Sequence, residues 1–224
     1  MFFTRAAAVM LAGVLIGFAP TFFLRPAYFT DPLPLLLVVH GVAMTAWFLV
    51  LAVQAYLAET GRLRWHRPLG WAGTVVAALV VVSSPPVIAR SVPTGLAAGL
   101  PGFAVSFIFM TGMLRVVFFA AMIVVAIRYR RRRVVHTRAL FMASLSNFAP
   151  ATSRMATMLG SNVLLVAFLY LIPFGIALAV HDRRTLTRVH PLTSWGVAAL
   201  VLILVLPIGL LFAGASQVIV ARLQ

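Results

Sequence analysis

Almost all the charge in this 224-residue chain is arginine, and the arginines gather in short segments between long apolar runs. The three richest segments are residues 61–67, 128–138 and 181–190. Short loops rich in Lys and Arg stay on the cytoplasmic side of a membrane, so this alternation is typical of a protein that crosses a bilayer several times. Only 9% of the residues are charged, against about a quarter in a soluble domain. The composition therefore excludes a soluble protein.

Crossing the hydrocarbon core takes about 20 apolar residues. On this rule the sequence predicts an all-α integral membrane helix bundle of seven transmembrane helices, forming a single domain over residues 1–224. The expected spans are residues 5–24, 33–57, 68–90, 102–128, 136–158, 160–181 and 192–220. The stretch 136–181 is too long for one span, so we expect a turn near Leu159–Asn162; a re-entrant fifth segment is the alternative. Prolines inside spans, among them Pro150, are expected to kink helices without breaking them.

Every second loop is basic, which predicts a multi-pass protein of the bacterial inner membrane with its N-terminus inside and its C-terminus outside. The loop arginines are expected to contact anionic lipid head groups at the cytoplasmic face. Nucleic acid is excluded as a partner, because the arginines form no stripe with interleaved aromatic residues. The absence of cysteine excludes disulfides and thiolate ligands, and the absence of lysine excludes a retinal Schiff base. Any redox function would need a bound cofactor.

The chain has only three acidic residues, Asp31, Glu59 and Asp182, and none lies within a predicted span. They are too few for a carboxylate-ligated di-metal site or an acidic proton relay. There is no Gly-rich phosphate loop and no nucleophile elbow. These absences argue against a hydrolase or an ATP-driven protein and leave enzymatic activity open.

Two His-Arg clusters lie at predicted cytoplasmic helix starts: His66-Arg67 and His136-x-Arg138. His181 and His190 border the third basic loop. Imidazoles gathered at one membrane face could ligate a metal or a heme iron. The alternative is that each histidine is a separate interface residue.

On the second helix His40, Trp47 and Gln54 recur every seven residues and therefore share one face. Gln54 lies roughly 21 Å inward of His40 at about 1.5 Å per residue. A histidine inside a span is costly without a partner. His40 and Gln54 are therefore candidate cofactor-binding residues, and an interhelical hydrogen bond is the alternative for His40.

Arg115 lies near the middle of the fourth span without an acidic partner in the sequence. Such a charge is a functional-site hypothesis, because a guanidinium can hold an anionic group; backbone pairing is the alternative. The fifth segment places Asn147 and Arg154 on one face and small residues at four-residue spacing, which favours close packing in the bundle interior. We therefore predict ligand binding by Arg115, Asn147 and Arg154.

Taken together, His40, Gln54, Gly61-Arg62, His66-Arg67-x-Leu69-Gly70 and His136-x-Arg138-x-x-x-Met142 resemble an uncharacterised family of small bacterial multi-span membrane proteins, over about residues 40–160. The resemblance implies a membrane bundle and brings no established activity. The paired histidines and arginines look like those of bundles that carry heme b.

The leading hypothesis is a heme- or metal-binding membrane redox protein, with His66 and His136 as axial ligands and Arg67 and Arg138 pairing with propionates. A carrier for a small molecule or lipid, with Arg115 and Asn147 around its pocket, is the second hypothesis. A structural subunit that packs in an oligomer or a larger membrane complex is the third.

Overall fold

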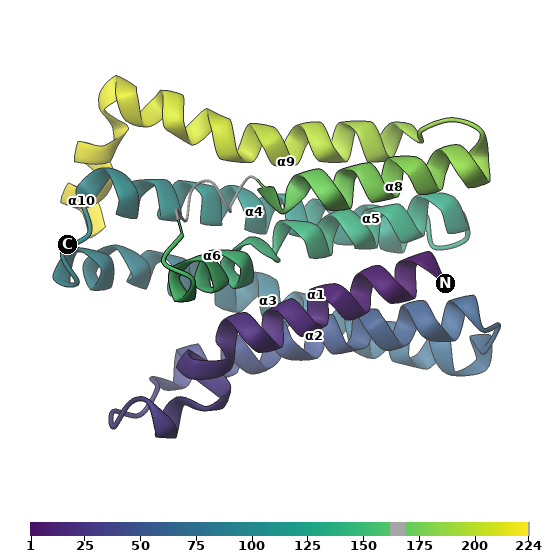
Figure 1. The fold of residues 1–224 in the computed structure, drawn as a ribbon, viewed down its shortest axis with the longest axis horizontal. Helices are drawn as coiled ribbons and strands as arrows, with labels where there is room; N and C mark the ends of the chain where they lie inside the picture. The colour runs from purple at the N-terminus through teal and green to yellow at the C-terminus, as the bar shows by residue number, and fades with distance from the viewer. Residues whose placement is uncertain (162–168, 224) are drawn as a thin grey trace.

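The computed structural model describes residues 1–161 and 169–223, and these residues form an all-α bundle without β-strands. The helices run mostly antiparallel to one another along one long axis (Figure 1). Their bounds are α1 Phe2–Phe18, α2 Leu35–Glu59, α3 Leu63–Ala97, α4 Gly102–Arg128, α5 Arg133–Ser146, α6 Ala149–Met158, α8 Leu171–Leu186, α9 Pro191–Leu210 and α10 Ser216–Leu223.

Among the described residues, five helical segments are long and apolar enough to cross a membrane, which agrees with the predicted multi-pass bundle. They are Phe2–Phe23, Leu35–Glu59, Leu63–Ala97, Gly102–Arg128 and Pro191–Leu210. The predicted fourth span, 102–128, coincides with α4. Helix α3 continues through Pro68, Pro85, Pro86 and Pro93, so these prolines do not end it.

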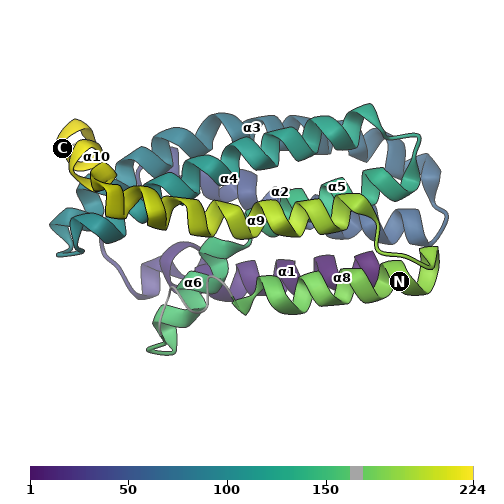
Figure 2. The same cartoon turned by 90° about the horizontal axis from the view of Figure 1, so that it is seen from above.

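The connections between α2 and α3, α4 and α5, and α8 and α9 all lie at the same end of the bundle as the N-terminus (Figures 1 and 2). We call this the basic end, because these connections and the helix ends beside them carry Arg62, Arg64, Arg67, Arg128, Arg130–Arg133, Arg183, Arg184 and Arg188. The C-terminus lies at the opposite end. Clustering the arginines at one end leaves the long middle of the bundle apolar, as a bilayer requires.

The fifth predicted helix, 136–158, is not continuous: α5 ends at Ser146 and α6 starts at Ala149. Pro150 has no N–H to donate to the carbonyl four residues before it. The backbone tightens there, with Asn147 N–H donating to Ser144 O at 3.2 Å and Phe148 N–H to Leu145 O at 3.2 Å. The expectation that Pro150 only kinks a span is therefore wrong, and α6 turns away from the line of α5 (Figure 2).

After α6 the chain turns at Gly160, whose φ of +62° favours glycine. This agrees with the turn expected near Leu159, although Asn162 lies outside the described residues. Helix α8 forms the second part of the predicted 160–181 helix, and residues 162–168 of that prediction also lie outside the described part. The predicted last helix, 192–220, ends earlier, because α9 is followed by a kink at Gly214 and the short α10.

Helices α5 and α6 supply much of the bundle interior. Ala139, Ala143 and Ala151 are completely buried, as the four-residue spacing of small residues predicts. A Cβ added at Gly17 of α1 would lie 2.5 Å from the carbonyl oxygen of Ala151, so α1 and α6 approach backbone to backbone at this point. This contact places the α5–α6 break inside the bundle.

Candidate functional site

The structure brings together the two histidines of the predicted His-Arg clusters at the basic end. His66 lies in the first turn of α3 and His136 in the first turn of α5, and their ring centres are 6.5 Å apart with the planes at 81°. The two residues are 70 positions apart in sequence. The antiparallel order of α2 to α5 returns the chain to the same end and makes this pairing possible.

Both rings have the same tautomer. His136 Nδ1 lies 2.9 Å from the carbonyl oxygen of Ala126, and His66 Nδ1 lies 3.3 Å from that of Gln54. A carbonyl oxygen can only accept, so each Nδ1 must carry the proton and donate it. Each neutral ring is then left with an Nε2 lone pair, which is the arrangement found in metal-ligating histidines.

Gln54 completes this cluster on the side of α2. Its Nε2 donates to the backbone oxygen of His66 at 3.0 Å, while its buried Oε1 has no hydrogen-bond partner within the part of the chain that the structure describes. The Gln54–His66 pair thus ties the end of α2 to the start of α3 through two hydrogen bonds, one in each direction. The residue that orients the His66 ring thus also carries a buried amide oxygen that could accept a further hydrogen bond.

The ring separation also suits one shared metal. With 6.5 Å between the ring centres, His66 and His136 are the residues that would hold such a metal together. The described residues contain no group of three or more histidine, cysteine or acidic side chains that could hold a metal ion.

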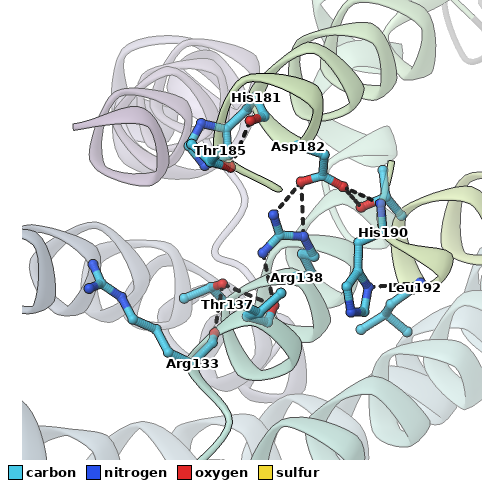
Figure 3. Close-up of polar contacts among 10 residues, drawn as sticks. Arg133, Thr137, Arg138, His181, Asp182, Thr185, His190 and Leu192 are labelled. Atoms are coloured by element: carbon cyan, nitrogen blue, oxygen red, sulfur yellow. Dashed lines mark hydrogen bonds and ion pairs between the residues drawn. The ribbon is translucent and has the colours of Figure 1, made fainter. Parts of the chain in front are cut away.

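The two arginines of the His-Arg clusters differ in their surroundings. Arg67 is exposed. Arg138 is buried and bound by Asp182, whose Oδ1 accepts from both Nε, at 2.9 Å, and Nη2 of the guanidinium (Figure 3). A third donor of Arg138, Nη1, reaches the backbone oxygen of Val134 at 3.0 Å. The Arg138 guanidinium is thus bound by groups of the protein itself. Of the two cluster arginines, Arg67 is the one available to an anionic ligand group.

Asp182 joins three helices at the basic end. Its Oδ2 accepts from the His190 N–H at 2.9 Å and from the Thr193 hydroxyl at 2.6 Å, so α5, α8 and the start of α9 meet on one carboxylate. Burial alone would raise the pKa of Asp182, but the hydrogen bonds from Arg138, Thr193 and the His190 N–H outweigh it and lower the pKa. We call this group the Asp182 cluster. No sequence pattern indicated this pairing, because Asp182 follows a predicted span and lies in a basic segment, 44 residues from Arg138.

The other two histidines of the basic end have structural roles. His190 caps α9: its Nδ1 accepts from the Leu192 N–H at 3.1 Å, so this ring has the opposite tautomer to His66 and His136. Burial, reinforced by repulsion from Arg138 and Arg188 against the attraction of Asp182, lowers the pKa of His190 and keeps the ring neutral for this role. His181 stacks on Phe2, with ring centres 4.4 Å apart.

His40 and Trp47 make the contacts expected of an interhelical polar face. His40 Nδ1 is 2.9 Å from the hydroxyl of Ser83 on α3, and the Trp47 indole donates to Ser144 on α5 at 3.2 Å. The alternative interpretation of His40 as an interhelical hydrogen-bonding residue is therefore supported. His40 and Gln54 are separated by about 21 Å along α2, so His40 belongs to a different part of the bundle from the His66–His136 pair.

His40, Arg115 and Asn147 line one cavity of about 80 Å³. Arg115 donates from Nε to the backbone oxygen of Thr111 at 3.1 Å, which is the backbone pairing considered as an alternative. Arg154 does not line this cavity; its guanidinium lies 4.5 Å from the centre of the Phe18 ring and its side chain is exposed. The structure thus joins two of the three predicted ligand-binding residues, together with His40.

Comparison of the chain with protein-family models, curated proteins and solved structures finds no match. The resemblance to small bacterial multi-span proteins therefore stays a prediction.

Proposed function

We propose that this chain is a seven-span inner-membrane redox protein that binds heme b through His66 and His136 at its cytoplasmic, basic end. The observation that carries the proposal is the pairing of two imidazoles, each with its Nδ1 proton bound to a backbone carbonyl and its Nε2 lone pair available. Heme iron with two imidazole ligands exchanges single electrons. A chain without cysteine needs such a group for redox chemistry.

The remaining residues of the basic end would serve this site in different ways. The carbonyls of Gln54 and Ala126 orient the two rings and increase the basicity of their Nε2 atoms. Arg67 would pair with a propionate, since its guanidinium is exposed at the same end. Arg138, through the Asp182 cluster, would act as a positioning residue that holds the start of α5, and with it His136, against α8 and α9.

In this proposal α5, α6 and α8 provide the fifth and sixth crossings as shorter helices, and the N- and C-termini lie on opposite sides of the membrane. The loop arginines then meet anionic lipid head groups on the cytoplasmic side. The whole chain would then form a single transmembrane helical domain.

The test is the absorption spectrum of protein purified from cells with an ample heme supply. The wild type is expected to show a Soret band that His66→Ala and His136→Ala each remove or shift. His40→Ala and His181→Ala are matched controls, because they delete an imidazole elsewhere in the same bundle and should leave the band unchanged. A colourless wild type would end the heme proposal, and metal analysis of that protein would show whether the same two nitrogens hold a single metal ion instead.

A further inference from the structure

A cavity between α2, α3, α4 and the α5–α6 break collects polar groups that the proposed heme site does not use. It has a volume of about 80 Å³ and is lined by His40, Ser84, Arg115 and Asn147 among apolar side chains. Because a water molecule takes up about 30 Å³ in the liquid, this cavity has room for a group of a few heavy atoms. The break at Pro150 places Asn147 at the C-cap of α5, beside the cavity.

Arg115 brings a positive charge that none of the three acidic side chains neutralises. All three acids lie elsewhere: Asp31 is exposed between α1 and α2, Glu59 accepts from the N–H groups of Phe3 and Thr4, and Asp182 is bound by Arg138. Within the described residues, the hydrogen bonds of the guanidinium, from Nε and Nη2, go to Thr111 of its own helix, and the nearby Tyr170 brings a phenol but no carboxylate. An uncompensated charge in the middle of an apolar bundle is costly, and an anion in the cavity would remove that cost.

Asn147 adds an independent signal from the other side of the cavity. Its side-chain Nδ2 is buried and has no hydrogen-bond partner among residues 1–161 and 169–223. A buried donor without an acceptor is destabilising, and an oxygen atom in the cavity would satisfy it. The donors of Arg115 and Asn147 therefore select for a ligand with several acceptor oxygens.

His40 determines which oxygen-rich anion fits best. The Ser83 hydroxyl donates to the carbonyl of Leu79 at 2.7 Å, so its oxygen must accept the Nδ1 proton of His40. The neutral ring is then left with Nε2 as an acceptor. A site that offers two donors and one acceptor matches a phosphate group in which unprotonated oxygens share the negative charge and one further oxygen is a hydroxyl.

We infer that the cavity of His40, Arg115 and Asn147 binds such a phosphate group, either as free phosphate or as the phosphomonoester headgroup of a lipid. Arg115 and Asn147 donate to its charged oxygens, and its hydroxyl donates to His40 Nε2. This site is independent of the heme proposal, because it involves different residues and lies towards the opposite end of α2 from Gln54.

The first test is the melting temperature of the full chain in phosphatidylcholine nanodiscs, with inorganic phosphate titrated at constant ionic strength. Phosphate is expected to raise the melting temperature of the wild type. Arg115→Leu and Asn147→Ala should each weaken the apparent affinity about tenfold or more, as the loss of one charge-assisted or buried hydrogen bond implies. Arg154→Leu is the matched control, because it deletes an arginine outside the cavity and should bind as the wild type does.

Sulfate separates a binding role of His40 from a structural one. Sulfate has the size of phosphate but no proton at neutral pH, so the wild type is expected to prefer phosphate and His40→Leu to lose that preference.

Nanodiscs with phosphatidic acid identify the source: stabilisation by this lipid with no response to free phosphate would assign the site to the headgroup. No stabilisation by either probe, or equal binding by wild type and all three cavity variants, would overturn the inference. His66→Ala should bind phosphate as the wild type does, so the phosphate test can be interpreted whether or not the heme proposal holds.

Discussion

At the residue scale, hydrogen-bond partners decide what each histidine can do. His66 and His136 donate from Nδ1 to carbonyls, whereas His190 accepts at Nδ1 from the backbone of α9. Residue spacing cannot reveal this difference, because it depends on which backbone group each ring meets in the fold. The sequence predicted that His66 and His136 share a membrane face, and the structure adds their pairing and their tautomer.

The Asp182 cluster leads to a prediction for stability. Asp182→Asn removes the charge that neutralises buried Arg138, and breaking a buried ion pair in this way is expected to cost about 3–5 kcal/mol. The double variant Arg138→Met, Asp182→Leu should recover most of that loss, because it leaves no buried charge without a partner. The free energy of unfolding of the detergent-solubilised protein measures both the loss in the single variant and the recovery in the double variant. Equal stability of Asp182→Asn and the wild type, or a double variant as unstable as the single one, would contradict this role.

The pKa of Asp182 sets the pH range over which the cluster acts. Its folded pKa is below its unfolded value of about 3.9. The stability that the carboxylate contributes is then fully present above the unfolded pKa and is lost as the pH falls through the lower folded pKa. We expect the melting-temperature difference between wild type and Asp182→Asn to stay constant from about pH 8 to pH 5 and to shrink only below about pH 4. A difference that already shrinks between pH 8 and pH 5 would count against the carboxylate as the source.

At the element scale, the long spans were predictable and the interrupted one was not. Apolar length predicts α2 and α4 closely, because each is a continuous hydrophobic stretch long enough to cross the bilayer as one unbroken helix. The break between α5 and α6 depends on Pro150 and on the close contact of α6 with Gly17 of α1, which only the fold reveals. The same break brings Asn147 to the cavity, so the least predictable element supplies part of the inferred ligand site.

The contact of α1 with α6 gives a prediction of its own. Gly17→Ala would place a Cβ 2.5 Å from the Ala151 carbonyl oxygen, and the resulting overpacking is expected to cost about 1–3 kcal/mol. Gly209→Ala in α9 is the matched control, since no atom lies within 4 Å of the added Cβ. That change should be neutral or slightly stabilising, because alanine favours a helix over glycine by roughly 0.5–1 kcal/mol. Unfolding curves that rank the two variants in the opposite order would argue against the close approach.

At the scale of the whole molecule, the arrangement of the charges predicts an orientation. The basic end gathers the connections that carry most of the arginine, and the C-terminus lies at the other end. Reporter fusions at Arg64, Arg132 and Arg184 should therefore read cytoplasmic, and fusions at Gly99 and at the C-terminus should read external. A cytoplasmic C-terminus would remove the seven-span proposal and favour a re-entrant α5–α6 segment.

The paired imidazoles at the basic end carry the proposed function, and heme titration of purified protein tests them most directly. We expect the wild type to bind one heme per chain, with a Soret band that saturates at that ratio. The His66→Ala, His136→Ala double variant is expected to bind none while keeping the melting temperature of a folded bundle. A wild type that binds no heme, or a double variant that binds it with the same stoichiometry and spectrum, would contradict the account.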